Sequence, residues 1–262
     1  MSEKKKKYGD SIQELKDYQG PDQIVSSFDL YDILSQSGDY EFMLHSKFPL
    51  LDTYLDGGFE SGELITISAP PKSGKTLLAQ TLTVNFLDQD QRALWFQYEV
   101  TPKRFLKAFP DLPRFYVPMK LEANNLDWLK ARILEGIYKE GISAVFIDHL
   151  HFLFDILTQK NTSLQIGQVV RFLKQLAIQH NIVIFLIAHM AKVRRDEEPD
   201  DSHIRDSSLI GAESDTVLIL WRDSKIENGA VLKIRYARRS GAMDKKVRLV
   251  KVDALLREAY YD

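Results

Sequence analysis

The stretch that decides the fold is Ala69-Pro70-Pro71-Lys72-Ser73-Gly74-Lys75-Thr76. It follows a short apolar run, Leu64 to Ser68, and opens a segment of helical character, Thr76 to Leu87. A strand, a glycine-containing loop and a helix in this order place backbone N–H groups and a helix N-terminus around a phosphate. The sequence therefore predicts that this loop binds the phosphates of a nucleoside triphosphate.

Three residues of the loop carry the expected chemistry. Gly74 lets the backbone curl close to the ligand, and Lys75 reaches the outer phosphates as a compact charge. Thr76 offers its hydroxyl to Mg²⁺. Ala69 stands where the usual pattern has glycine. An ordinary strand-to-helix turn is the alternative, and the flanking elements argue against it.

Strands and helices alternate along most of the chain, and the alternation predicts the fold class. Further strands are expected at Ala93–Tyr98, Arg114–Pro118, Ala144–Ile147, Ile182–Ala188 and Thr216–Trp221, helices at Leu126–Ile137 and Ile166–Ala177, and two strands joined by residues 238–246 within Val231–Tyr260. Such a pattern is typical of an α/β fold. We predict a mostly parallel sheet flanked by helices, with a C-terminal antiparallel hairpin.

Composition sets the domain count and excludes several classes of site. The chain has 262 residues, of which 44% are apolar, and this suits one large domain. The absence of cysteine excludes disulfides, thiolate metal sites and cysteine nucleophiles. A formal charge of −2 excludes a broad positive surface but permits a local basic channel. No apolar run has membrane-spanning length and the polar N-terminus resembles no secretory signal, so we expect no membrane partner and a cytoplasmic location, in the host cell if the protein is viral.

The N-terminal region is expected to lie outside the main domain. Residues 1–25 form a polar tail, residues 26–38 a short linker helix, and residues 39–262 the main domain. Ser27 is the expected N-cap of that helix, and Phe28, Tyr31, Ile33 and Leu34 share one of its faces. This apolar face packs either on the chain's own core or on a neighbouring subunit.

Three polar residues end predicted strands beside the phosphate loop. Asp148 can hold a magnesium-bound water, Glu99 can accept the proton of an attacking water, and His189 can bond the terminal phosphate. Ligands of open parallel sheets bind at this carboxyl edge. The alternatives are a turn aspartate, a solvated glutamate and a core histidine.

A charged loop follows the predicted strand that ends at His189. Its basic residues, Lys192, Arg194, Arg195, His203 and Arg205, suit contacts with the phosphates of single-stranded nucleic acid. Acidic residues lie among them: Asp196, Glu197, Glu198, Asp200 and Asp201. A solvated loop without a ligand is the alternative interpretation.

Together these features resemble the RecA-like ATPases, and more closely the DnaB-type replicative helicases and the phage and mitochondrial primase-helicases. The resemblance covers residues from about 48 to 250. Its motifs are Phe48–Asp52, Gly57–Phe59 and Gly62–Leu64 before the phosphate loop, Phe96–Val100 around Glu99, Val145–Leu150 around Asp148, and Ile187–Met190 around His189. The family tolerates alanine at the position of Ala69, and histidine at the position of His189 is typical of the phage and mitochondrial branch.

Two later segments extend the resemblance. His203–Ile210 resembles the family's loop that touches single-stranded DNA in the channel of a ring. Arg238-Arg239-Ser240-Gly241 resembles the segment that supplies an arginine finger to the neighbouring subunit's nucleotide. Alignment on bacterial members favours Arg239 and alignment on phage members favours Arg238. A solvated hairpin tip is the alternative, and no arginine is expected beside the chain's own phosphate loop.

The resemblance implies an ATPase that assembles into a hexameric ring and acts as a helicase or translocase on single-stranded DNA in replication. It implies ATP or another nucleoside triphosphate and Mg²⁺ as cofactors, and primase or other replication proteins as partners. One alternative is a RecA-, RadA- or KaiC-like ATPase of recombination or regulation that does not unwind DNA. Another is an ATP-binding assembly module with negligible hydrolysis.

Overall fold

The computed structural model describes residues 16–20, 23–37, 42–109, 111–153, 162–190, 193, 198–204, 207–223 and 226–259. Its contacts divide the chain into two units, residues 1–40 and residues 41–262, and each is described by itself.

The first unit contains helix α2, Ser27–Ser37. Ser26 caps this helix, because its hydroxyl accepts a hydrogen bond from the Asp29 N–H at 3.1 Å and donates one to the Asp29 carboxylate at 2.6 Å. The expectation that Ser27 is the N-cap is therefore wrong by one residue. Phe28 and Tyr31 on this helix are 82% and 72% exposed.

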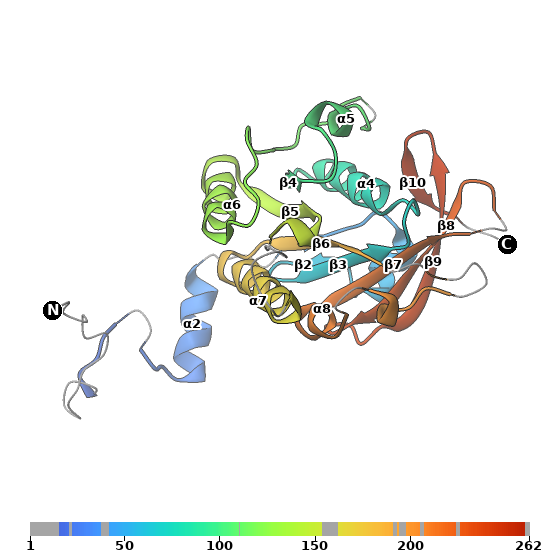
Figure 1. The fold of residues 1–262 in the computed structure, drawn as a ribbon. Helices are drawn as coiled ribbons and strands as arrows, with labels where there is room; N and C mark the ends of the chain where they lie inside the picture. Colours follow the sequence, from blue (N-terminus) through green and yellow to red (C-terminus); the bar gives the residue numbers. More distant parts are fainter. Residues whose placement is uncertain are drawn as a thin grey trace. The chain divides into compact units, whose positions relative to one another are not determined.

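The second unit is built around one eight-stranded sheet of order β10-β9-β8-β7-β3-β6-β5-β4 (Figure 1). The strands are β3 Leu64–Ala69, β4 Arg92–Gln97, β5 Ile142–Asp148, β6 Val183–His189, β7 Thr216–Arg222, β8 Gly229–Ala237, β9 Met243–Val252 and β10 Leu255–Glu258. From β4 to β7 all neighbours are parallel, whereas β7 to β10 pair antiparallel. A separate antiparallel pair joins β1, Met43–Leu44, to β2, Phe59–Glu60.

Helices cover both faces of this sheet. They are α3 Pro49–Tyr54, α4 Lys75–Leu87, α5 Pro102–Leu106, α6 Leu126–Glu140, α7 Thr162–His180 and α8 Ser207–Glu213, with 3-10 turns η1 Leu150–Leu153 and η2 Asp201–His203. Helix α4 packs into one hydrophobic core, and α6 and α7 pack into the other. Neighbouring residues of β5 face opposite cores, as the two-residue period of a strand requires: Phe146 faces the first and Val145 the second. Among the described residues, no helix is long and apolar enough to cross a membrane.

The parallel strands end in register, and this alignment positions the site. Ala69 at the end of β3 lies opposite His189 at the end of β6. Gln97 at the end of β4 lies opposite Asp148 at the end of β5. The carboxyl ends of four neighbouring strands thus meet at one edge of the sheet, where ligands of such folds bind.

Two expected strand assignments differ from the structure. Residues 114–118 form only an isolated bridge, in which Tyr116 exchanges backbone hydrogen bonds with Ala93 and Trp95 at 2.9 Å. Pro113 and Pro118 flank Tyr116 and lack the N–H that a longer ladder needs. The C-terminal region forms three antiparallel strands instead of two. Residues 243–246 were expected in the connection but belong to β9. Their side chains are exposed, so this part of the strand lacks the apolar alternation by which a strand is recognised in sequence.

We expect Phe146→Ala to lower the free energy of unfolding by about 3–5 kcal/mol, the usual loss for a fully buried phenylalanine. The Phe146 ring stacks between Trp95 and Phe185, with centroids at 4.7 Å and 4.6 Å. Urea denaturation measures the change. Tyr138→Ala, at a side chain that is 78% exposed, is the control and should change stability by no more than about 0.5 kcal/mol. Similar losses in the two variants would show that the aromatic stack does not stabilise the fold.

Candidate nucleotide-binding site

The loop between β3 and α4 has the backbone shape of an anion-binding site. Lys72 and Gly74 adopt positive φ angles of 63° and 97°, and Gly74 directly precedes the first residue of α4. No side chain of the described residues caps the N-terminus of α4. Curled backbone of this kind points successive N–H groups into one concavity, and the helix N-terminus adds positive potential.

Lys75 and Glu99 face each other across the cleft beside this loop. The Lys75 side chain is only 9% exposed, and its Nζ lies 4.0 Å from Glu99 Oε2. The Glu99 N–H donates to Gln97 Oε1 at 2.7 Å, which orients the residue just past the end of β4. The structure therefore brings together the predicted phosphate-binding lysine and the predicted proton acceptor.

Asp148 is buried at the centre of the site. Its Oδ2 accepts hydrogen bonds from Thr76 Oγ1 and Gln97 Nε2, both at 3.0 Å. Its Oδ1 is buried and has no hydrogen-bond partner among the described residues. Burial raises the pKa of Asp148, against the opposing hydrogen bond from Gln97 and the charge of Lys75. A buried carboxylate oxygen of this kind beside a threonine hydroxyl suits a divalent cation, because hard cations prefer oxygen ligands.

His189 lies at the same edge, at the end of β6. Its ring meets the ring of His149 edge-on, with centroids 4.0 Å apart. The His149 ring contacts Phe152 at 4.8 Å, and Phe152 stacks on Tyr98 at 5.6 Å. A row of rings thus joins the ends of β6, β5 and β4. The sequence did not assign a role to His149, because only the sheet brings it beside His189.

Two clefts flank the phosphate loop. One, of about 410 Å³, is lined by Lys75, Thr76, Gln97, Glu99, Arg104 and Asp148, among others. The other, of about 530 Å³, lies on the opposite side of Lys72 and Gly74 and includes Arg222, Asn228 and Lys251. The expectation that no arginine stands beside the loop is therefore wrong. Arg104 on α5 and Arg222 at the end of β7 line the two clefts that also include Lys72 and Gly74.

Arg238 and Arg239 lie at the opposite edge of the sheet from the phosphate loop. Strand β8 runs antiparallel to β7, so its last residue, Ala237, pairs with Thr216 at the start of β7. The two arginines follow directly and are not brought near the chain's own Glu99 and Asp148.

The two arginines differ in their partners. Arg239 Nε lies 3.0 Å from carboxylates of both Glu60 and Glu63, and its Nη2 donates to the carbonyls of Leu55 and Gly58 at 2.6 Å. Arg238 is exposed and donates to the last turn of α8, to the carbonyls of Gly211 and Ala212. Arg239 is therefore tied into its own chain on several sides, and Arg238 is the more available of the two.

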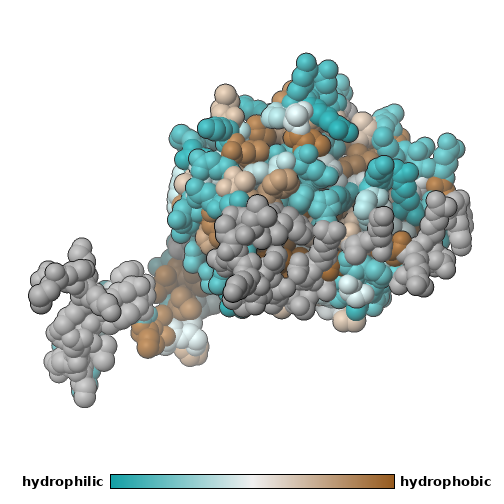
Figure 2. Space-filling model, in the orientation of Figure 1, coloured by the Kyte–Doolittle hydropathy of each residue, from teal (hydrophilic) through white to brown (hydrophobic). Residues whose placement is uncertain are grey.

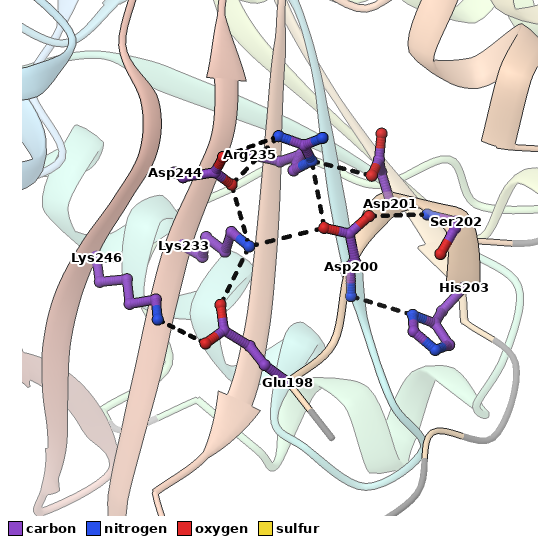
Figure 3. Close-up of polar contacts among 9 residues, drawn as sticks. All are labelled: Glu198, Asp200, Asp201, Ser202, His203, Lys233, Arg235, Asp244 and Lys246. Atoms are coloured by element: carbon purple, nitrogen blue, oxygen red, sulfur yellow. Dashed lines mark hydrogen bonds and ion pairs between the residues drawn. The ribbon is translucent and has the colours of Figure 1, made fainter.

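The predicted DNA-binding residues Lys192, Arg194, Arg195 and Arg205 lie outside the described residues. The described part of the same loop is held at two places. Met190 bridges to Ile204, and the acidic residues from Glu198 to Asp201 pair with cations of β8 and β9 (Figure 3). These acids are thus neutralised by the chain itself.

The strand order, the loop between β3 and α4, and the carboxylate at the end of β5 define a RecA-like nucleotide-binding domain. The model of the DnaB-like helicase C-terminal domain family matches residues 115–254. The chain belongs to this family.

Relatives and solved structures agree with this assignment. The replicative DNA helicase DnaB of Helicobacter pylori is 27% identical over 273 residues, covering 90% of this chain and 53% of that protein. DnaB of Haemophilus influenzae is 22% identical, covering 78% of this chain and 53% of that protein. The chain spans about half the length of these curated relatives.

Two solved structures are similar at 18% sequence identity, which shows the fold alone. One is described as an ATPase domain, has a TM-score of 0.74 and matches 89% of this chain and 97% of that chain. The other, a DnaB-like replicative helicase described with its interactions with primase, has a TM-score of 0.74 and matches 94% of this chain and 70% of that chain.

We expect Asp148→Asn to leave the ligand-free fold as stable as the wild type at neutral pH, or more stable. The raised pKa means that ionising the buried carboxyl opposes folding, and the amide removes this penalty. Melting curves should converge as the pH falls below the ordinary aspartate value, where the wild type is protonated in both states. Nucleotide with Mg²⁺ should raise the melting temperature of the wild type and not of the variant. A variant that is still stabilised by Mg²⁺-nucleotide would rule out Asp148 as a metal-holding residue.

Proposed function

We propose that this domain binds ATP with Mg²⁺, hydrolyses it, and uses the hydrolysis to move a ring of subunits along single-stranded DNA as a DnaB-like replicative helicase. The observation that carries the proposal is the cluster of Lys75, Thr76, Glu99 and Asp148 around a curled phosphate loop, in a chain of the DnaB-like family. Such a function belongs in the cytoplasm, where replication of a bacterial or phage genome takes place.

Each residue of the cluster takes one role. The N–H groups of residues 69–76 and the Lys75 ammonium bind the phosphates, and Thr76 and Asp148 hold Mg²⁺, which neutralises charge on the phosphate oxygens. Glu99 orients the attacking water and accepts its proton. His189 donates a hydrogen bond toward the terminal phosphate. Arg104, which lines the same cleft, adds a second positive charge.

The second cleft suits the nucleoside. It lies on the far side of Lys72 and Gly74 from Glu99, so a triphosphate that follows the loop extends its ribose and base into this space. Its walls combine apolar Ile226 and Leu256 with polar Arg222 and Asn228. Apolar walls with a few polar groups are typical of small-ligand sites.

Assembly places the arginine edge of one subunit against the nucleotide of the next. Arg238 is the proposed finger, because among the described residues it forms no ion pair, whereas Arg239 is paired with Glu60 and Glu63. Arg239 is proposed to keep the hairpin on its own domain through Glu60 and Glu63. A hexameric ring is the proposed form.

Helix α2 offers a further contact for assembly. Brown apolar residues cover its surface in Figure 2, and Phe28, Tyr31, Ile33 and Leu34 are each more than half exposed. An apolar helix face of this kind needs a partner surface in water. We propose that it docks on the neighbouring subunit.

The loop after β6 is the proposed contact with DNA. Glu198, Asp200 and Asp201 are paired with cations of β8 and β9. Lys192, Arg194, Arg195 and Arg205 are the residues proposed to attract the phosphates of DNA. Primase is a proposed partner, in line with the helicase structure described with primase. The alternatives are a RecA-, RadA- or KaiC-like ATPase of recombination or regulation that does not unwind DNA, and an ATP-binding assembly module with negligible hydrolysis. Assays of ATP turnover and DNA unwinding separate them.

We expect Glu99→Gln to reduce ATP turnover by about 10²- to 10⁴-fold, the usual contribution of a general base, with nucleotide affinity nearly unchanged. The variant should also fail to unwind a forked DNA substrate that the wild type unwinds. Glu140→Gln, at the C-terminal end of α6, is the matched control. Equal turnover in wild type and Glu99→Gln, with no response to DNA, would overturn the helicase proposal.

We expect Arg238→Ala to lose ATP turnover and Arg239→Ala to lose stability. Arg238→Ala should keep its melting temperature and lose turnover by about 10³- to 10⁵-fold, as for other arginine fingers. Arg239→Ala should lower stability by about 1–3 kcal/mol, the usual cost of leaving a buried polar group such as Glu63 without its partner.

Mixing subunits tests whether Arg238 acts on a neighbour. Arg238→Ala subunits keep a complete nucleotide site, and Lys75→Ala subunits keep the finger. A mixture of the two should therefore recover turnover that neither shows alone. No recovery, in a mixture shown to co-assemble, would mean that Arg238 does not act in trans.

A further inference from the structure

A network of ion pairs joins the loop after β6 to β8 and β9, the strands before and after Arg238 (Figure 3). At its centre, Arg235 of β8 contacts the loop through Asp201 at 2.9 Å and Asp200 at 3.4 Å. The same guanidinium contacts Asp244 of β9 at 3.1 Å. Arg235 therefore bridges the loop and the hairpin with one side chain.

Lys233 makes a second bridge from the same strand. Its side chain is 8% exposed, and its Nζ lies 3.1 Å from Glu198, 3.1 Å from Asp244 and 3.8 Å from Asp200. Burial acts to lower the pKa of Lys233, but hydrogen bonds to Asp244 and Glu198 outweigh it and the pKa is raised. Lys246 of β9 adds a further contact to Glu198.

The segment held by this network is connected to the nucleotide site at its other end. Ile204 is buried and forms a bridge with Met190, which directly follows His189. Strand β8 continues from Arg235 to Ala237, and Arg238 comes next. One segment, residues 198–204, thus contacts both Met190, which follows β6, and β8, the strand that leads to Arg238.

We propose that Arg235 and Lys233 are positioning residues that fix the DNA-contacting loop against the strand carrying Arg238, so that DNA bound at the loop stimulates hydrolysis through that arginine. This rests on the proposed function of the domain. Most of these pairs are partly exposed, with Asp201 and Asp244 at 37% and 49%, so each alone stabilises the fold little. The network instead fixes the position of the loop relative to β8. These two elements are distant in sequence: Lys233 and Glu198, which pair, are 35 residues apart.

The test removes each arm of the Arg235 bridge in turn. Arg235→Gln breaks both arms, Asp201→Asn weakens the loop arm, in which the contact with Asp200 remains, and Asp244→Asn breaks the hairpin arm. Lys47→Gln, which removes an exposed ion pair to Asp88, is the control. For each variant, ATP turnover without DNA and at saturating single-stranded oligonucleotide, DNA affinity and melting temperature are measured.

All three variants should lose DNA stimulation, by roughly 2- to 30-fold, the range seen for residues that couple two sites. Turnover without DNA and DNA affinity should stay close to wild type. Adding Asp201→Asn to Arg235→Gln should change little, because Arg235→Gln already removes the contact between Arg235 and Asp201. Arg235→Lys should restore stimulation only in part, since one ammonium does not reach both carboxylates as the guanidinium fork does.

Several results would overturn the proposal. If DNA stimulates the ATP turnover of Arg235→Gln as much as that of the wild type, the Arg235 bridge is not required for the stimulation. Weaker DNA affinity with normal stimulation at saturation means that the network only shapes the DNA site. Full stimulation in Asp244→Asn excludes the hairpin arm. Asp244 is an exposed residue near the start of β9, so this variant serves as the test if Arg235→Gln does not fold. A parallel fall in melting temperature, basal turnover and stimulation assigns a structural role instead. A wild type without any DNA stimulation overturns the proposed function itself, and the coupling with it.

Discussion

The buried carboxylate of Asp148 is the interaction on which the site depends. Its Oδ2 is held by Thr76 from the first turn of α4 and by Gln97 from the end of β4, while its own strand supplies the backbone. Three elements are therefore fixed relative to one another by one group. Burial makes the charged form costly, and a cation at Oδ1, which has no partner among the described residues, would offset that cost. The burial that opposes ionisation of Asp148 in the domain alone thus fits the proposed binding of Mg²⁺ at this carboxylate.

The residues of the phosphate site and the proposed arginine finger lie at opposite edges of the sheet. Parallel strands bring Lys75, Glu99, Asp148 and His189 to the carboxyl edge, and the antiparallel return of β8 delivers Arg238 to the opposite edge. A subunit therefore holds a phosphate site and an arginine that its own geometry keeps apart. If a neighbour's arginine completes the site, as proposed, hydrolysis depends on assembly.

Much of the site was predictable because it is local in sequence. The phosphate loop lies within eight consecutive residues between a strand and a helix, and Asp148 and His189 directly end apolar runs that are typical of buried strands. The choice between Arg238 and Arg239 was not predictable, because both stand in the same charged turn. Contacts of Arg239 with Glu60 and with Glu63, which lies 176 residues earlier, are the reason for proposing Arg238 as the finger. The role of residues 192–205 in binding DNA stays a prediction.

The sequence by itself determined the α/β class, the position of the phosphate loop and the identity of the residues at the strand ends, because strand, turn and helix signals depend on neighbours in the chain. Only the tertiary structure decided that Gln97 and Arg104 join the cleft, that Arg239 is tied to its own domain, and that acids after β6 pair with Lys233 and Arg235. These contacts join groups far apart in sequence. Charge and polarity show that such groups need partners, and the register of the strands selects which partners they find.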